Sequence, residues 1–477
     1  MENKLLKGLI WKFLERFGVQ GVQFVLQIIL ARLLSPQHYG VLSIMVIFVA
    51  LANVFIQNGF NTALVQDKNV SEEDYSSVFW IMAIVATILY GLLFVSAPLI
   101  GHFYNMPSIV VPFRVIALML FPGVINSIQL AKTSRALDFK KVFYGNIGGI
   151  LVSGIVGIIL AYFGAGIWAL VFQTLLNVTI STCVMWFMVH WRPKLYCDLK
   201  RVAKLFSFGW KLLVSSLIDT LYQDLSSLII GKKFSSGTLG YYNRGKQFPQ
   251  FVITAISSTV QSVMLPAMAE HQDEKANVKY LMRNSIIMSS YLVFPMMAGL
   301  IGVASTLISL LLTDVWLPSV PFLQIFCISM AFYPVHMCNL QAINAMGRSD
   351  IFLKLEIIKK SIGIMALMVA VFFFETPIAI AMTGVFTMVT SCFINAYPNK
   401  KLIDYSYFEQ IRDYLPALIV STVMCLAVYC VGYIECALIV KLLLQIILGV
   451  VVYIVLSILF QLKGFKMLLT VLKGFRN

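Results

Sequence analysis

Blocks of about twenty apolar residues recur along this chain, and they constrain its fold more than any other feature. A helix of that length crosses the ~30 Å hydrocarbon core of a bilayer. The chain has 477 residues, of which 60% are hydrophobic and 12% are charged, whereas a soluble protein is about a quarter charged. The sequence therefore predicts an all-α integral membrane protein. Breaks at Gly, Pro and charged loops divide it into about fourteen helices, near residues 10–34, 38–62, 76–100, 112–132, 142–163, 166–190, 205–231, 238–265, 284–312, 320–345, 352–374, 377–397, 412–433 and 437–461.

The formal charge of +15 raises the question of a nucleic-acid partner, and the placement of the charges argues against one. Most Lys and Arg residues lie in alternate loops, and intervening loops such as "GHFYNMPS" and "FGAG" have almost none. This alternation follows the positive-inside rule and predicts that both termini lie in the cytoplasm. Lys232 and Lys233, on the predicted outer side, are the clearest exception.

Cysteine and histidine give no metal or redox pattern. None of the eight cysteines forms a C-x-x-C pair, and the five histidines make no H-E-x-x-H pattern. We therefore expect no metal site and no cofactor.

The chain also repeats itself. "ARLLSPQHYG" at 31–40 aligns with "GKKFSSGTLG" at 231–240, and "FPGVINSIQLAKTSRALDF" aligns with "YPVHMCNLQAINAMGRSDI". The second alignment sets Pro122 on Pro334 and Asp138 on Asp350. We therefore predict two pseudo-symmetric six-helix lobes, 1–200 and 201–400, with two further helices and a cytoplasmic tail in 401–477. Two such bundles facing each other across a midplane cavity are typical of transporters.

Two helices carry polar stripes. Lys12, Arg16, Gln20, Gln23 and Gln27 are spaced by three or four residues and fall on one helix face. The repeat sets these positions on Lys211, Ser215, Asp219, Tyr222 and Ser226, which are again all polar. A charge facing lipid costs about 3 kcal/mol at the bilayer centre, so both stripes are expected to face protein or water. Either they form interhelical hydrogen bonds, or they line opposite walls of one hydrated cavity, which is the interpretation we favour.

Other charges lie within the apolar helices. Arg244, Lys246 and Gln247 occur early in the eighth predicted helix, Arg114 opens the fourth, and Glu356, Lys359 and Lys360 occur in the eleventh. Snorkelling to the headgroups is an alternative for Arg114, Lys359 and Lys360. A cationic cavity selects an anionic ligand, and arginine pairs bidentately with phosphate.

The few acids within these helices have two possible uses: they neutralise the cations, or they carry a coupling ion or proton. Glu15 lies beside Arg16, and Glu356 lies one turn before Lys360, which fits neutralisation. Asp219, on the second stripe, is the leading coupling candidate.

Missing motifs separate the function classes. No G-x-x-x-x-G-K-[ST] loop is present, so this chain has no P-loop for ATP. A membrane glycosyltransferase would need extracytoplasmic carboxylates, and the predicted outer loops offer little beyond Asp314 and Glu435. We therefore expect that the protein is not an enzyme.

Several of these segments resemble one known family. "ARLLSPQHYGVLSIMVIF", "NGFNTALVQ", "LGYYNRGKQFPQF" and the paired P-x(6)-Q helices are similar to the polysaccharide transporter family of the multidrug/oligosaccharidyl-lipid/polysaccharide (MOP) exporter superfamily, which includes Wzx-type flippases. The similarity covers nearly the whole chain. It implies alternating access that moves an undecaprenyl-diphosphate-linked oligosaccharide across the bacterial inner membrane.

The resemblance also implies roles for particular residues. Arg16 and Arg244 are the positions that match the family's diphosphate-binding cations. From the charges and polar stripes themselves, we expect Lys246 and Lys211 to join that site, Gln20, Gln23, Gln27, Tyr222 and Gln247 to line the cavity, and Asp219, Glu15 or Glu356 to couple transport to an ion. Implied partners are membrane lipids, a polysaccharide polymerase and a chain-length regulator. The alternatives are a cation-coupled multidrug or metabolite exporter of the same superfamily, a membrane glycosyltransferase, and an assembly scaffold without transport.

Overall fold

The computed structural model describes the backbone of residues 2–57, 60–67 and 69–474. Within these ranges the side chains at 2–10, 12–13, 15–16, 208, 255, 257–263, 471–472 and 474 lie outside the description. The described backbone is helical with connecting loops and contains no strand. It divides into two compact units, Met1–Gly240 and Tyr241–Asn477, and each is described by itself.

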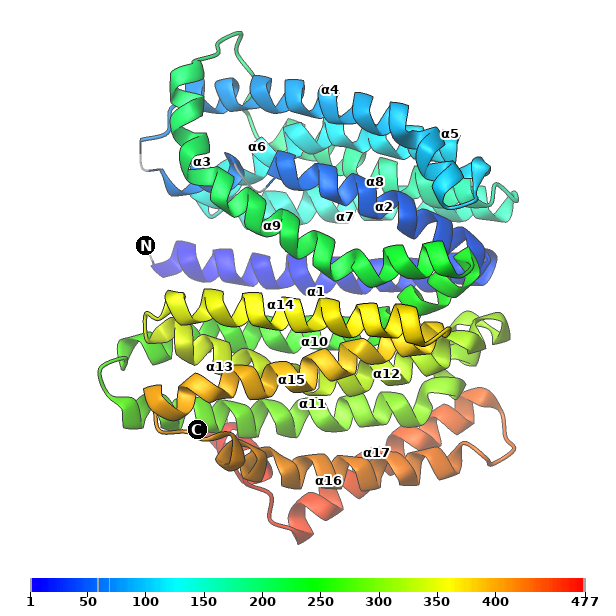
Figure 1. The fold of residues 1–477 in the computed structure, drawn as a ribbon, viewed down its shortest axis with the longest axis vertical. Helices are drawn as coiled ribbons and strands as arrows, with labels where there is room; N and C mark the ends of the chain where they lie inside the picture. Colours follow the sequence, from blue (N-terminus) through cyan, green and yellow to red (C-terminus); the bar gives the residue numbers. More distant parts are fainter. Residues whose placement is uncertain (1, 58–59, 68, 475–477) are drawn as a thin grey trace. The chain divides into compact units, whose positions relative to one another are not determined.

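The first unit holds the helices of the first half and the first helix of the second half (Figure 1). Their bounds are α1 Glu2–Leu33, α2 Pro36–Gln57, α3 Phe60–Gln66, α4 Glu72–Phe103, η1 Pro107–Ile109, α5 Val110–Ile116, η2 Ala117–Met119, α6 Leu120–Ala136, α7 Phe139–Tyr162, α8 Ile167–Met188 and α9 Leu199–Lys233. Helix α10, Ser236–Glu270, begins in this unit and continues in the second.

The second unit holds the remaining helices. Their bounds are α11 Lys275–Leu312, η3 Asp314–Ser319, α12 Val320–Ala331, α13 Tyr333–Ala345, α14 Ser349–Phe373, α15 Pro377–Leu402, α16 Tyr407–Val431, α17 Leu438–Leu459 and α18 Lys463–Gly474. Within this unit α11 packs along α16 and α17, which Figure 1 shows in green and orange to red.

Polar caps mark where several of these helices begin. Ser71 and Asp74 form a capping box at α4, and Ser406 and Glu409 form another at α16. The side chain of Asp198 accepts from two backbone N–H groups at the start of α9. Such caps satisfy N–H groups that have no partner within the helix, so the short polar segments in this sequence set the helix starts.

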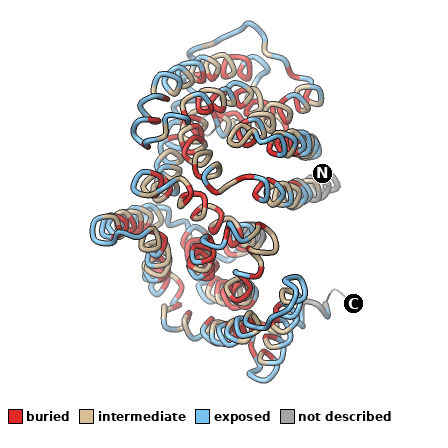
Figure 2. Tube along the Cα trace, turned by 90° about the vertical axis from the view of Figure 1, so that its right-hand side faces the viewer, coloured by how far each residue is buried: buried red, intermediate tan, exposed pale blue. Residues whose placement is uncertain are grey.

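Ten helices of the described chain are long and apolar enough to cross a membrane, which makes this a multi-pass membrane protein. Helices α9, α10 and α14 are not among the ten, and α1 contributes only the shorter apolar stretch Phe17–Leu33. Figure 2 shows that buried and exposed turns alternate along single helices, so each helix has two different faces. Many exposed residues are large and apolar, such as Val450 and Ile454 on α17, as expected for faces that contact lipid.

The repeated segments 31–40 and 231–240 meet each other within the first unit. A Cβ on Gly40 would lie 1.7 Å from the carbonyl oxygen of Ser236, and a Cβ on Gly240 would lie 2.1 Å from that of Pro36. Pro36 and Ser236 are the first residues of α2 and α10. The aligned glycines thus let the two helix starts cross at backbone contact, and each copy makes the same contact to the other.

Helix α9 belongs to the first compact unit, where it packs against α2, α3 and α4. The sequence repeat places the same helix at the start of the second lobe. The lobe boundaries at 200 and 400 follow the repeat and stay a prediction, whereas the compact units divide after Gly240.

Two helix-interior prolines are compensated by side chains from other helices. Pro98 has no N–H to donate to the carbonyl of Phe94, and Arg114 Nε donates to that oxygen at 3.2 Å while its guanidinium stacks 4.0 Å from the Phe94 ring. Pro295 likewise leaves the carbonyl of Tyr291 without its helical donor, and the Tyr453 hydroxyl donates to it at 2.8 Å. Arg114 therefore has a structural partner within the first unit.

Candidate functional site

Every candidate site residue from the sequence lies on α1, α9, α10 or α14, which are the four long helices outside the set of ten apolar spans. Membrane helices carry polar groups where they contact protein or water rather than lipid. The candidates are Glu15, Arg16, Gln20, Gln23 and Gln27 on α1, Lys211, Asp219 and Tyr222 on α9, Arg244, Lys246 and Gln247 on α10, and Glu356 on α14.

The glutamine stripe of α1 lies opposite the helix face that is most exposed. Gln20, Gln23 and Gln27 are each half-buried, whereas Val25 and Ile29 are 55% and 37% exposed. A neighbouring face of α1 packs against α7, where Leu26 fills the space beside Gly154. The polar face is thus turned away from the lipid-like face. The side chains of Lys12, Glu15 and Arg16 lie outside the described residues.

The stripe of α9 changes its environment along the helix. Lys211 and Ser215 are exposed, whereas Asp219, Tyr222 and Ser226 are half-buried. Asp219 and Tyr222 both take part in side-chain interactions. The half-buried part of the stripe therefore begins at Asp219.

Contacts with Gln247 and Trp316 hold the side chain of Arg244 on α10. Its side chain is buried, with 5% of the residue exposed. Its Nη1 donates to Gln247 Oε1 at 2.5 Å, and its guanidinium carbon lies 5.3 Å from the centre of the Trp316 ring. Gly245 permits this position, because a Cβ there would lie 2.7 Å from Phe322 Cβ. Stacking on an aromatic ring and a donor contact to an amide restrict a guanidinium to one orientation.

Glu356 on α14 forms an ion pair within its own helix. Its Oε1 lies 2.5 Å from Nζ of Lys359, whose side chain is only 6% exposed. Spacing along the helix predicted Lys360 as the partner of Glu356, whereas the observed contact is to Lys359, three residues on rather than four. The burial of Lys359 also argues against the snorkelling alternative for that residue.

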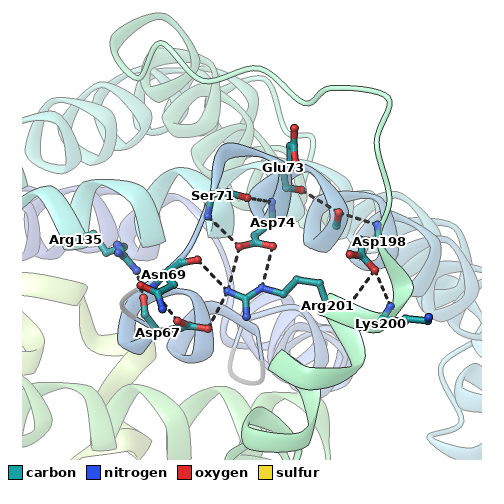
Figure 3. Close-up of polar contacts among 10 residues, drawn as sticks. Asp67, Asn69, Ser71, Glu73, Asp74, Arg135, Asp198, Lys200 and Arg201 are labelled. Carbon is teal, nitrogen blue, oxygen red and sulfur yellow. Dashed lines mark hydrogen bonds and ion pairs between the residues drawn. The ribbon is translucent and has the colours of Figure 1, made fainter.

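An ionic cluster joins α9 to the loop before α4, and Figure 3 shows the Arg201 guanidinium at its centre. Arg201 Nε and Nη2 donate to the two Asp74 carboxylate oxygens at 3.1 and 3.2 Å. Nη2 also lies 2.9 Å from Asp67 Oδ2 and 3.1 Å from the carbonyl of Asn69. Bidentate contacts of this kind fix orientation as well as charge.

The cluster shifts the pKa of two of its groups: the hydrogen bond to Asp74 raises that of Arg201, and the pKa of Asp67 is lowered. The backbone N–H of Asn69 donates to its carboxylate at 2.9 Å. This hydrogen bond is the largest effect and lowers the pKa of Asp67 from its ordinary value. Desolvation opposes it, and the charge and hydrogen bond of nearby Arg201 lower the pKa further.

The second unit repeats this contact with the charges exchanged. Arg283 on α11 donates to Asp413 on α16 at 2.7 Å, and the Asp413 side chain is 2% exposed. Asp413 follows Arg201 by the same offset that sets Asp350 on Asp138. The acid lies on α4 in the first half and on α16 in the second. Applied to Asp74, the same offset gives Ile286 rather than Arg283, so the repeat offset relates one member of the pair and not the other.

A buried amide network in the second unit was not predicted. Asn339, Asn399 and Gln410, from α13, α15 and α16, are each 0% exposed. Asn339 exchanges hydrogen bonds with Gln410 at 2.8 and 3.1 Å, and Asn399 donates to Asn339 Oδ1 at 2.8 Å. Single amides within apolar segments give no spacing signal, so sequence reasoning had no means to group them.

Comparison with known proteins gives one family and two curated relatives. The model of the polysaccharide biosynthesis protein family matches residues 29–321, which is more than half of the chain. The teichuronic acid biosynthesis protein TuaB of Bacillus subtilis (strain 168) is 24% identical over 353 residues, covering 73% of each chain. The lipopolysaccharide biosynthesis protein WzxC of Escherichia coli (strain K12) is 24% identical over 378 residues, covering 77% of this chain and 75% of WzxC.

A solved structure gives the fold. The lipid II flippase MurJ in an inward closed conformation matches with a TM-score of 0.77 at 16% identity, covering 95% of this chain and 98% of MurJ. The chain therefore has the fold of a membrane transporter. The resemblance to polysaccharide transporters found in the sequence is confirmed: this chain belongs to the polysaccharide biosynthesis protein family.

Proposed function

We propose that this protein flips an undecaprenyl-diphosphate-linked oligosaccharide from the inner to the outer leaflet of a bacterial inner membrane. The diphosphate and the sugars cannot cross ~30 Å of hydrocarbon unaided, because their desolvation is prohibitive. A hydrated path lined by amides and cations replaces the lost hydrogen bonds, while the prenyl tail stays in lipid. Alternating access between the two lobes would carry the headgroup across.

The observation that carries this proposal is the buried Arg244 on α10, a long helix of a multi-pass membrane protein. Its guanidinium is oriented by Gln247 and Trp316 before any ligand arrives. A preorganised guanidinium matches phosphate oxygens bidentately and loses little side-chain entropy on binding. Arg16, Lys211 and Lys246 are the further cations assigned to the diphosphate.

The glutamines and Tyr222 are assigned to the sugar. Amide and phenol groups donate and accept hydrogen bonds without carrying charge, which suits neutral hydroxyls. The half-buried state of Gln20, Gln23 and Gln27, opposite the exposed apolar face of α1, supports this assignment.

Asp219 is the proposed coupling residue. Among the acidic candidates Glu356 is already held at 2.5 Å by Lys359, whereas Asp219 lies where the α9 stripe becomes half-buried. Transport by an Asp219→Asn variant, followed over a pH series and a sodium series, tests this role. Ion dependence that matches the unmodified protein would remove Asp219 from it.

Complementation of a flippase-deficient strain tests the function. The unmodified gene should restore surface polysaccharide, Arg244→Ala and Arg16→Ala should each reduce it at least tenfold, and Arg244→Lys should recover only part, because lysine keeps the charge but not the fork. Arg348→Ala is the matched control, since Arg348 is exposed and paired with Asp350. Full restoration by both alanine variants, at equal protein levels, would contradict the site. The deficient strain should accumulate lipid-linked precursor. If the unmodified gene fails to clear this precursor, the proposed function is contradicted.

A further inference from the structure

The second unit contains a polar cavity of about 670 Å³ between the starts of α11 and α16 and the turn from α17 to α18. Its lining includes three cations, Arg283, Arg412 and Lys463, and two carboxylates, Glu409 and Asp413. Asp413 is neutralised by Arg283 at 2.7 Å, and Glu409 by Lys279 from outside the cavity at 3.1 Å. Arg412 and Lys463 are exposed and have no acidic partner among the described residues. The cavity therefore has a surplus of positive charge.

An apolar groove of about 550 Å³ adjoins this cavity. It runs between α11, α16 and α17, and residues such as Leu300, Val428 and Val450 line it. Tyr291 lines both the groove and the polar cavity. The apolar groove and the charged cavity therefore meet at Tyr291.

The turn between α17 and α18 builds the junction. Gln461 adopts a left-handed backbone conformation with φ of 48°, and Leu462 behind it is buried. A Cβ on Gly464 would lie 2.5 Å from Tyr291 Cβ, so α18 begins in direct contact with that ring. The turn thereby places Lys463 at the cavity wall. Helix α18 itself has Lys466 and Lys473 exposed while Leu468 lines the groove, the pattern of a helix that lies at a membrane surface.

We infer that this cavity and groove bind an anionic phospholipid of the surrounding membrane, with its phosphate between Arg412 and Lys463 and one acyl chain in the groove. A phosphodiester carries one negative charge, which Arg412 and Lys463, the two cations of the lining without a carboxylate partner, can hold between them. The carboxylates of Glu409 and Asp413 accept hydrogen bonds, so a headgroup that carries hydroxyls, such as glycerol, fits beside the phosphate. A diphosphate, with more charge, would meet the same two carboxylates less favourably.

The inference is independent of the proposed function, because it concerns a resident lipid of the second unit rather than a transported one. Purified full-length protein in detergent is titrated with dioleoyl phosphatidylglycerol or dioleoyl phosphatidylcholine, and bound lipid is counted by native mass spectrometry. We expect phosphatidylglycerol to bind at least about tenfold more tightly, which corresponds to about 1.4 kcal/mol.

Two variants remove the two parts of the site. The double variant Arg412→Ala/Lys463→Ala should bring phosphatidylglycerol down to the affinity of phosphatidylcholine. Lys400→Ala/Lys473→Ala is its control, because it removes the same charge from exposed positions outside the cavity. Gly299→Leu should lower the affinity for both lipids, because a side chain there projects into the groove and its Cβ meets only Met424, at 3.8 Å.

Folding of each variant is checked by its helical circular dichroism. If the double variant does not fold, Arg412→Lys is measured instead. Because Arg412→Lys keeps the positive charge, it should bind phosphatidylglycerol within a few-fold of the unmodified protein. Equal affinity for the two lipids, or equal loss in the control, would overturn the inference. Displacement of phosphatidylglycerol by inorganic pyrophosphate at similar concentration would show a site for free phosphate instead. Tighter binding of undecaprenyl phosphate than of phosphatidylglycerol would show a site for the prenyl lipid instead.

Discussion

Replacing Tyr453 by phenylalanine removes one hydroxyl from the interior of the second unit without changing the shape of the ring. The hydroxyl donates to the carbonyl of Tyr291 at 2.8 Å, and that carbonyl has lost its helical donor because Pro295 follows four residues later. Tyr453 is 7% exposed, and its ring centroid lies 5.1 Å from that of Tyr291. Phenylalanine keeps the ring contact and leaves the buried carbonyl without a donor.

Leaving a buried hydrogen-bond acceptor unsatisfied costs about 1–3 kcal/mol. We expect Tyr453→Phe to lower the free energy of unfolding by about 1.5 kcal/mol. In the background of Pro295→Ala the restored backbone N–H donates to the same carbonyl. The same Tyr453→Phe change should then cost less than about 0.5 kcal/mol, so the two changes should couple by about 1 kcal/mol.

The assay is unfolding of the four purified proteins of this double-mutant cycle in mixed detergent and dodecyl sulfate micelles, followed by tryptophan fluorescence. Equal costs of Tyr453→Phe in the two backgrounds, with coupling below about 0.3 kcal/mol, would refute the compensation of Pro295 by Tyr453. The same result would show that the hydrogen bond from Tyr453 to the Tyr291 carbonyl does not stabilise the packing of α17 on α11.

Three further outcomes follow from contacts within the first unit. Arg201→Ala should cost about 2 kcal/mol, between the values for exposed and buried ion pairs. Arg201→Lys should recover only part of it, because lysine keeps the charge but not the two-pronged contact to Asp74; thermal unfolding measures both. Gly40→Ala and Gly240→Ala should each cost about 3 kcal/mol, and by similar amounts, because each new Cβ would meet a backbone oxygen that cannot move aside. Asp67 has a lowered pKa, so its stabilisation of the loop before α4 is complete above the ordinary value of about 3.9 and is lost as the pH falls through the lowered value. Backbone amide exchange in that loop, corrected for intrinsic rates, should therefore become faster as the pH falls through that range. The same acceleration should be absent in Asp67→Asn.

Controls distinguish these effects from general loss of stability. Gly21→Ala should be neutral or slightly stabilising, since a Cβ at Gly21 meets nothing within 4 Å. Full recovery by Arg201→Lys would contradict the bidentate contact between Arg201 and Asp74. Strongly unequal effects at the two glycines would contradict the symmetric crossing of α2 and α10.

The sequence alone predicted the features that depend on long patterns. Apolar blocks predicted an all-helical membrane protein, and ten helices of the described residues are long and apolar enough to cross a membrane. The repeat predicted the equivalence of 31–40 and 231–240, where the structure places Gly40 and Gly240 in matching contacts. The spacing of Gln20, Gln23 and Gln27 predicted a polar face, and the structure places these three side chains opposite the exposed face of α1.

Features that depend on one pair of residues were beyond the sequence. No spacing along the chain joins Tyr453 to Tyr291 or Arg114 to Phe94, because each pair is formed by the packing of two different helices. Glu356 had two lysines within reach on its own helix, and spacing did not decide between them. Helix α9 is the first helix of the second sequence repeat, yet it packs in the first compact unit. Alignment of the repeats shows which helices correspond, but it does not show against which helices α9 packs.

Direct measurement of lipid translocation tests the central claim. The purified protein is reconstituted into liposomes that contain a fluorescent undecaprenyl-diphosphate-linked oligosaccharide, and the fraction accessible to a membrane-impermeant quencher is followed with time. The account predicts translocation with the unmodified protein, at least about tenfold slower translocation with Arg244→Ala, and an unchanged rate with Arg348→Ala. No translocation above protein-free liposomes, or equal rates in the unmodified protein and Arg244→Ala, would contradict it.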